Sequence, residues 1–316
     1  MPNPKFLDAE VISASISMLD LVEPLKEAMI AITQAAATHP PRFAAPLNAA
    51  GRIGVMYGSL TNPPIHGAKI LSLFPEAPAL GLSSHQGFVT LFDSTDGSPL
   101  AICDADRITA MRTAMTSMVA TRCLARPNPK IITICGAGEQ AEWHIRASLL
   151  CFEHAEIRLW ARNPVAASAL RDKFAQDIGQ ISVIPDLKQA ISGTDVIHTT
   201  TAAKEAFLPG AFLQAGQHVN LVGASLADSR EIDDEGVARV SMFTDSLESA
   251  SREAGELLGA TRTGAISADY PVFELGQALT HNGVGRKFDL EITAYKSHGL
   301  IVQDLITAYE VYKRNI

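Results

Sequence analysis

Several features that mark other protein classes are missing from this chain of 316 residues. No apolar run reaches the roughly 18–20 residues that a helix needs to cross a bilayer, and residues 1–8 lack the apolar stretch of a secretory signal peptide. Basic residues are in the minority, and the net charge is −8. We therefore expect no nucleic-acid partner and no acidic membrane partner, because both require clustered Lys and Arg.

Paired cysteines and ligand-spaced histidines are also missing. Cys103, Cys123, Cys135 and Cys151 are scattered without a Cys-x-x-Cys pair, as expected for reduced, mostly buried thiols of a cytoplasmic protein. The nine histidines form no pair at metal-ligand spacing, so we expect no metal site. Hydrophobic residues make up 47% of the chain, enough for a large core, and the length favours two domains.

The most informative segment covers residues 130–141, where a short apolar β-type run ends in Gly-x-Gly-x-x-Ala. Gly136 would allow a tight turn, Gly138 would let the backbone approach a pyrophosphate, and Ala141 would let helix and strand pack closely. The helix that follows would offer free N–H groups to phosphate oxygens. The segment predicts a dinucleotide-binding loop made of Gly136, Ala137, Gly138, Glu139 and Gln140.

After this loop, β-type and helix-type patterns alternate, which predicts a parallel sheet with right-handed crossovers. The expected strands cover residues 156–161, 181–185, 195–199, 218–222 and 240–244, and the expected helices cover residues 165–178 and 187–191. The predicted fold class is α/β, with a doubly wound Rossmann-type domain over residues 125–294.

The first half has a different pattern. A helix-type segment at residues 10–37 precedes short β-type runs at 54–58, 67–74, 87–93 and 99–102, followed by a helix at 105–124. Asp96-Gly97 is a hairpin turn signal. Residues 1–124 therefore predict an α+β domain with a mostly antiparallel sheet. Residues 292–316 show helical spacing, and we expect the chain from residue 295 to pack back on this first domain.

In a Rossmann-type domain, a residue at the end of the second strand contacts the adenosine ribose of the cofactor. An acid there selects NAD, whereas a basic residue accommodates the 2′-phosphate of NADP. This chain has Ala161, Arg162 and Asn163 at that place, so Arg162 favours NADP(H), with NAD(H) as the alternative if Arg162 is only a solvated loop residue. Further cofactor contacts are expected from Thr200, Thr201 and Val222.

Three cations in the first half are candidates for chemistry. Lys69 lies in an otherwise apolar run, so it points either outward or into a pocket where desolvation would lower its pKa. Arg112 lies on an apolar helix and needs an anion, either a substrate carboxylate or an internal Asp or Glu. Arg42, after two prolines, has the weakest signal of the three.

Two short segments have both a functional and an ordinary interpretation. Ser84 and His85 precede a strand and either contact a cofactor or substrate or form a plain turn. Ser297 is either a helix N-cap or a cofactor contact.

Taken together, six ordered motifs resemble the ornithine cyclodeaminase/mu-crystallin family nearly end to end. The motifs are Gly67-Ala68-Lys69, Ser84-x-x-Gly87 through Asp93, Ile108-Thr109-x-x-Arg112-Thr113-Ala114, the glycine loop, Arg230-Glu231-Ile232-Asp233 and Lys296-Ser297-x-Gly299. The resemblance implies a homodimer formed through the sheet of the first domain. It also implies that Arg42, Lys69 and Arg112, with Met56, face a bound amino or imino acid next to the nicotinamide, and that Ser84, His85, Arg112, Thr113 and Ser297 contact the cofactor.

Departures from the family pattern help to choose among its reactions. Cyclodeaminases carry an acid shortly before the Met of the early strand and another on the late strand, where this chain has Gly54 and Ser225. Asp228 is near but falls three positions later. A carboxylate base for ornithine deamination is thus missing, and Gly-Ala-Ser with Ser-His-Gln is similar to mu-crystallin and the ketimine reductases.

The resulting hypothesis is NAD(P)H-dependent reduction of a cyclic imino acid, Δ1-pyrroline-2-carboxylate or Δ1-piperideine-2-carboxylate, to L-proline or L-pipecolate. In this scheme Arg112 and Arg42 hold the carboxylate, and Lys69 hydrogen-bonds the ring nitrogen or the carboxylate. The alternatives are ornithine cyclodeaminase with a recycled NAD, a reductive-amination amino acid dehydrogenase, and a non-catalytic binding protein.

Overall fold

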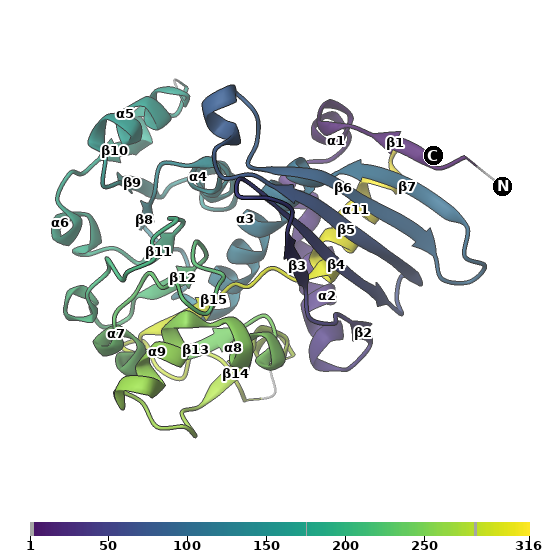
Figure 1. The fold of residues 1–316 in the computed structure, drawn as a ribbon. Helices are drawn as coiled ribbons and strands as arrows, with labels where there is room; N and C mark the ends of the chain where they lie inside the picture. The colour runs from purple at the N-terminus through teal and green to yellow at the C-terminus, as the bar shows by residue number, and fades with distance from the viewer. Residues whose placement is uncertain (1–2, 175, 281–282) are drawn as a thin grey trace. The chain divides into compact units, whose positions relative to one another are not determined.

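The chain forms two compact units in a computed structural model that describes residues 3–174, 176–280 and 283–316 (Figure 1). The first unit runs up to Thr116 and includes Gly299–Ile316, and the second covers Ser117–His298. The sequence placed these borders after residues 124 and 294. The difference arises because helix α3 (Ala105–Leu124) is shared: beyond its midpoint Thr121 accepts a hydrogen bond from Asn220 of the second unit at 2.9 Å.

The first unit is built on a seven-stranded sheet of order β1-β7-β6-β5-β4-β2, with β3 also paired to β4. Every pair is antiparallel except β1 with β7, so the expected mostly antiparallel sheet is confirmed. The elements are β1 (Lys5–Leu7), α1 (Ala9–Ser15), η1 (Met18–Leu21), α2 (Val22–Thr33), β2 (Ala37–Thr38), β3 (Phe43–Pro46), β4 (Arg52–Leu60), β5 (Ile65–Leu73), η2 (Ala77–Leu80), β6 (His85–Asp93), β7 (Pro99–Asp104) and α11 (Ile301–Lys313).

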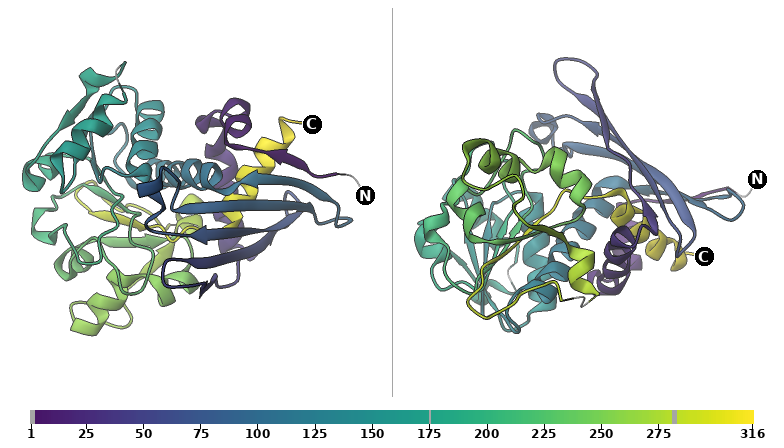
Figure 2. Two further views of the ribbon diagram at one scale, coloured as in Figure 1. Left: turned by 45° about the horizontal axis from the view of Figure 1, so that its top comes forward. Right: turned by 90° about the horizontal axis from the view of Figure 1, so that it is seen from below.

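The two faces of this sheet differ. Helix α11, yellow in Figure 2, runs along the sheet and contacts β4, β5, β6 and β7, while α2 packs on α11. Side chains alternate between the faces along each strand, so Val89 and Leu91 are fully buried under α11 whereas Phe88 and Ile70 are exposed.

The second unit is built on an eight-stranded parallel sheet of order β10-β9-β8-β11-β12-β15-β13-β14, which confirms the predicted doubly wound domain. The chain moves from β8 outward to β10, then returns to β11 on the other side of β8. The elements are β8 (Ile131–Cys135), α4 (Glu139–Cys151), β9 (Glu156–Trp160), α5 (Pro164–Asp172), η3 (Ile178–Gln180), β10 (Ile181–Val183), α6 (Leu187–Ile191), β11 (Val196–Thr199), η4 (Gly210–Phe212), β12 (His218–Leu221), α7 (Asp234–Arg239), β13 (Ser241–Thr244), α8 (Leu247–Glu253), α9 (Gly255–Thr263), β14 (Val272–Glu274), α10 (Leu275–Leu279) and β15 (Thr293–Lys296).

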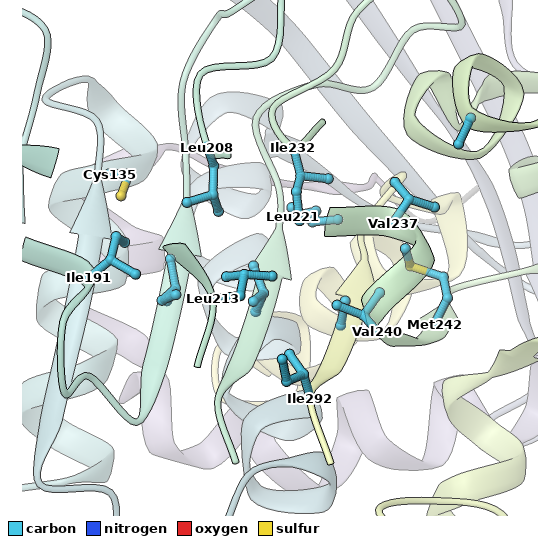
Figure 3. Packing of buried hydrophobic residues seen from close by; sticks show 14 of the residues in the cluster. Cys135, Ile191, Leu208, Leu213, Leu221, Ile232, Val237, Val240, Met242 and Ile292 are labelled. Carbon is cyan, nitrogen blue, oxygen red and sulfur yellow. The ribbon is translucent and has the colours of Figure 1, made fainter. Parts of the chain in front are cut away.

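Apolar clusters cover both faces of the parallel sheet, as parallel strands require. On one face Cys135, Ile197 and Leu221 pack with residues of α6 and α7. Figure 3 shows Cys135 and Leu221 in this cluster with Ile191 and Val237. Ile134 and Val196 immediately precede Cys135 and Ile197 on β8 and β11. Their side chains face the other way and pack in a second cluster with α4 and α5. The sheet thus lies between two apolar layers.

The predicted helix over residues 292–316 is wrong in its first part. Thr293–Lys296 forms strand β15 between β12 and β13, and the helix begins only at Ile301. All four strand residues are fully buried, and a short buried parallel strand cannot be told from buried helix by its pattern. Gly299, with φ +73°, separates the two elements.

Other predicted helices are shorter than expected. The segment at residues 10–37 is divided into α1, η1 and α2, because Ile16 is extended and Ser17 starts a new capped turn. The helix predicted over residues 165–178 ends at Asp172.

Polar groups in the core of the second unit form a neutral layer. His144, His198 and His218 are fully buried, and burial lowers the pKa of His144 to about 4 and that of His218 to about 3. The His144 ring hydrogen-bonds the Ser117 hydroxyl at 3.0 Å, and the His218 ring hydrogen-bonds the Thr293 hydroxyl at 2.9 Å. In the described ranges no cluster of three His, Cys, Asp or Glu side chains could hold a metal ion, and no helix there could span a membrane.

Candidate functional site

Lys69 is the only lysine in the middle of β5, and its side chain points to the α11 face of the sheet. Directly opposite it lie Met56 on β4 and Val89 on β6. The lysine is 2% exposed, which settles the choice left open by the sequence: it points inward. Thr109 of α3 accepts a hydrogen bond from its Nζ at 3.2 Å.

The counter-ion of Lys69 is Asp304, a fully buried residue in the first turn of α11. The Lys69 Nζ lies 2.8 Å from Asp304 Oδ2, and the Arg112 Nε lies 3.0 Å from Asp304 Oδ1. Two buried cations therefore share one carboxylate, and the immediate group carries an excess positive charge.

Arg112, on α3, is 5% exposed and donates from Nη1 to the Gln303 side-chain oxygen at 2.8 Å. The internal acid considered from the sequence thus exists, and it is Asp304. Together these bonds use two of the five N–H donors of a guanidinium. Gly299 must be glycine for this packing, because a Cβ there would lie 2.7 Å from Arg112 Nη1 and its φ is +73°.

Burial lowers the pKa of Lys69 to about 8. The Asp304 carboxylate opposes this effect, whereas the positive charges of Arg112 and Arg42 add to it. Arg42 lies just before β3, and since Phe43 pairs with Val55, it comes beside Met56 on the face that carries Lys69. The structure therefore brings the three predicted cations together.

His85 begins β6, and Ser84 precedes it. The Ser84 hydroxyl lies 2.8 Å from His85 Nδ1. Desolvation and the positive charge of Lys69 lower the pKa of His85, while Asp106 raises it. Ser83 links these groups, because its hydroxyl donates to Asp106 at 2.9 Å and accepts from the His85 backbone at 3.1 Å. Ser84 and His85 thus belong to the surroundings of Lys69 in the first unit. Thr113, also predicted as a cofactor contact, donates its hydroxyl to the Thr109 carbonyl at 2.7 Å within α3.

The glycine loop of the second unit fits the pyrophosphate of a dinucleotide. Gly136 has φ +140°, and a Cβ on it would lie 2.6 Å from Thr200 Oγ1, whereas a Cβ on Gly138 would meet no atom within 4 Å. Gly138 is the N-cap of α4, with no side chain bonded to the first turn, so backbone N–H groups there suit phosphate oxygens. Ala137 and Glu139 complete the loop, and Gln140 Oε1 is buried with no hydrogen-bond partner among the described residues.

The other predicted cofactor residues of this unit follow directly after strands. Ala161, Arg162 and Asn163 follow β9, Thr200 and Thr201 follow β11, Val222 follows β12, and Ser297 follows β15. Because the strands are parallel, these residues all lie at one edge of the sheet, the carboxyl edge where α/β proteins bind ligands.

Two of these residues, Asn163 and Ser297, have a structural role as well. Asn163 caps α5, accepting from the Val165 backbone at 3.0 Å, and Arg162 beside it is exposed. Ser297 is not an N-cap, because α11 starts after Leu300; its backbone extends the β15 pairing by donating to the Leu221 carbonyl at 3.0 Å.

Glu231 holds this edge together. Its fully buried carboxylate accepts hydrogen bonds from Thr199 Oγ1 (2.7 Å), the Thr201 backbone (2.8 Å) and hydroxyl (2.7 Å), and the Gly223 backbone (2.7 Å). One carboxylate thus fixes the loops after β11 and β12.

Sequence reasoning missed the roles of Asp304 and Glu231. Asp304 was detectable in principle as a lone acid on the apolar side of the last helix, between Val302 and Leu305. Glu231 gave no such signal, because an acid next to Arg230 in a polar loop is ordinarily solvated.

A family model described as "Ornithine cyclodeaminase/mu-crystallin family" matches residues 3–316. The chain belongs to the ornithine cyclodeaminase/mu-crystallin family. The predicted family is therefore confirmed. Mouse (Mus musculus) ketimine reductase mu-crystallin is 33% identical over 315 residues, 98% of this chain and 96% of that protein.

Two solved structures have the same fold over nearly the whole chain. Δ1-pyrroline-2-carboxylate reductase of Thermococcus litoralis, in complex with NADH and L-proline, is 31% identical with a TM-score of 0.91 and covers 98% of this chain and 97% of its own. An archaeal alanine dehydrogenase dimer with bound NAD is 28% identical, with a TM-score of 0.90 and coverages of 98% and 95%.

We predict that Asp304→Asn destabilises the protein by about 3–5 kcal/mol, because it leaves two buried cations without their carboxylate. Urea unfolding followed by circular dichroism measures this. Glu23→Gln on α2 is the control: Glu23 and its partner Lys26 are 68% and 38% exposed, so its loss should cost less than about 1 kcal/mol. Equal losses in the two variants would show that Asp304 is not the required counter-ion.

Proposed function

We propose that this protein is an NAD(P)H-dependent reductase of cyclic imino acids, converting Δ1-pyrroline-2-carboxylate or Δ1-piperideine-2-carboxylate to L-proline or L-pipecolate. The observation that carries the proposal is the buried group of Lys69 and Arg112 around the single carboxylate of Asp304. Such a group favours a small anion, since an additional negative charge compensates the excess positive charge. Relatives described as a ketimine reductase and a pyrroline-2-carboxylate reductase support the same reaction.

In this proposal the substrate carboxylate binds Arg112 and Arg42, which orients the C=N bond. A guanidinium is suited to this because its N–H groups match the two carboxylate oxygens. Met56, opposite Lys69, lies beside the bound ring. Ser84 and His85 lie near enough to Lys69 to contact the substrate or cofactor from the start of β6.

Lys69 places a proton at the imine nitrogen. Its pKa of about 8 lies near neutral pH, so its protonated amine gives up a proton more readily than an exposed lysine does. Protonation of the nitrogen makes the adjacent carbon electron-poor, and addition of hydride to that carbon with a proton on nitrogen gives the secondary amine of the product.

Reduced nicotinamide supplies the hydride when bound. We propose that its pyrophosphate is held by the loop of Gly136, Ala137, Gly138, Glu139 and Gln140, and that Ala161, Arg162, Asn163, Thr200, Thr201, Val222 and Ser297 contact the rest of the dinucleotide in the second unit, with Thr113 and Arg112 as contacts from α3.

We further propose NADP(H) as the preferred cofactor. Arg162 is exposed directly after β9, where a residue contacts the adenosine ribose of a dinucleotide. Its neighbours in the sequence, Ala161 and Asn163, carry no carboxylate. A guanidinium in that place accommodates a 2′-phosphate.

The protein is proposed to be a homodimer formed through the open face of its antiparallel sheet. Phe43, Val55, Ile70 and Phe88 form one cross-strand row on this face, and Phe43, Ile70 and Phe88 are 60%, 45% and 47% exposed. A contiguous apolar patch on several strands marks an interaction site. An alanine dehydrogenase with the same fold is a dimer. We also propose a cytoplasmic location, as the sequence predicts.

Lys69→Ala should reduce NADPH-dependent turnover of pyrroline-2-carboxylate by about 100-fold or more, because the proton donor is lost, while NADPH binding by fluorescence titration stays unchanged.

In the wild type, kcat/KM should fall as pH rises past about 8, where Lys69 loses its proton. In Lys69→Arg this fall should disappear. Lys26→Ala is the control, because Lys26 forms an exposed ion pair with Glu23. Ammonia release from ornithine without imine reduction would instead indicate a cyclodeaminase.

Arg162→Ala should weaken NADPH binding by about 10–100-fold, since a charged hydrogen bond to phosphate is lost, and leave NADH binding within about threefold. Fluorescence titration with both cofactors measures the difference. Arg171→Ala is the control, because Arg171 pairs with its exposed neighbour Asp172. Equal weakening of both cofactors would remove the assignment of Arg162 to a 2′-phosphate.

Phe88→Asp should convert a dimer of about twice 33.7 kDa into a monomer, because a charge cannot be buried unpaired in an apolar interface. Analytical ultracentrifugation measures the mass. Val165→Asp, at an apolar residue that is 76% exposed on α5, should leave the dimer intact. A Phe88→Asp variant that is still a dimer would place the interface elsewhere, and a monomeric wild type would overturn the proposed dimer.

A further inference from the structure

The face of the sheet that carries Lys69 is organised in cross-strand rows. The first row holds the cation and its neighbours: Arg42 beside Met56, then Lys69 and Val89. The second row, one pleat further along the strands, consists of Ala44, Gly54, Leu71 and Gly87. Residues in adjacent rows on one face lie about 7 Å apart. A small ring bound next to the Lys69 amine can therefore reach the second row.

Helix α11 packs closely on the sheet at the other side of the first row. At Gly58 and Gly67, on the other side of the first row, a Cβ would lie 2.7 Å from Ile301 and 2.8 Å from Leu305, both of α11. At Gly54 the three atoms nearest to a Cβ belong to Leu73, at 3.3 Å, and Leu71, at 3.9 Å, both on the neighbouring strand, and none belongs to α11.

The second row is also open and apolar. Gly54, Leu71 and Gly87 are half-buried, whereas Lys69 in the next row is buried. Two glycines without side chains beside one leucine leave a shallow floor next to a buried amine. Such a floor suits the methylene groups of a ring whose nitrogen and carboxylate are held by the cations.

We propose that the methylene side of the imino acid ring lies over Gly54 and Leu71, and that Gly54 sets the largest ring the protein accepts. This inference rests on the proposed function and deepens it. A five-membered and a six-membered ring differ by one methylene, and that methylene lies on the side away from the nitrogen and the carboxylate carbon. The absence of a side chain at residue 54 is what leaves room for it.

Gly54 is the better residue to test than Gly87. A Cβ on Gly87 would lie 1.9 Å from the Ile70 carbonyl oxygen, so any side chain there disturbs the sheet. A Cβ on Gly54 comes closest to the end of a flexible leucine side chain, which can move by a few tenths of an ångström.

The experiment measures kcat/KM for pyrroline-2-carboxylate and piperideine-2-carboxylate with NADPH in the wild type and two variants. Gly54→Ala should lower the value for the six-membered ring about 10-fold or more relative to the five-membered ring, because one methylene in an apolar pocket changes rates about 10–200-fold. Leu71→Ala should shift the ratio in the opposite direction, since it deepens the floor.

The control is Gly179→Ala in the second unit, where a Cβ would meet no atom within 4 Å; it should leave the ratio unchanged. If circular dichroism shows that Gly54→Ala is not folded, the ratio of kcat/KM values measured for Leu71→Ala tests the proposal by itself. An unchanged ratio in the folded variants overturns the role of this floor but leaves the reductase standing. A wild type that reduces neither ring overturns the proposed function itself.

Discussion

The shared carboxylate of Asp304 is the interaction on which the first unit depends. Removing an ammonium and a guanidinium from water is unfavourable by several kcal/mol each, and a carboxylate compensates this only with good geometry. Asp304 provides that geometry, with one oxygen toward Lys69 and the other toward Arg112. Because it serves two cations, the site retains an excess positive charge without exposing either of them. The same pairing joins three elements distant in sequence, since β5, α3 and the last helix each contribute one charge.

The second unit uses a carboxylate in a different way. Glu231 is surrounded by neutral donors, and it satisfies hydroxyl and backbone groups of two loops that follow adjacent strands. In the first unit a carboxylate balances charge, whereas here it sets backbone position. The loops after β11 and β12 are therefore fixed at the carboxyl edge of the sheet, the edge that also carries the glycine loop.

A single sheet can serve two functions because side chains alternate between its faces. Lys69 and Ile70 are consecutive residues of β5, yet the first is buried beside Asp304 and the second is 45% exposed on the opposite face. A one-residue slip of register would exchange them, so the pairing of β4, β5 and β6 fixes both the proposed catalytic face and the proposed dimer face.

Local patterns in the sequence determined the elements whose residues are neighbours along the chain. The glycine loop, the alternation after it, the antiparallel strands and the family motifs depend on spacing over a few residues, so they were predictable. Strand β15 was not, because four buried residues carry no periodicity that separates strand from helix.

Only the tertiary structure decided which charges meet. The sequence showed that Arg112 needs an anion and that Lys69 either points inward or outward, but the answer, Asp304, lies 192 residues from Arg112. A buried ion pair depends on how elements distant in the sequence pack together. The local spacing of residues does not predict that packing. The sequence thus determined the parts of the site, and the fold determined their partners.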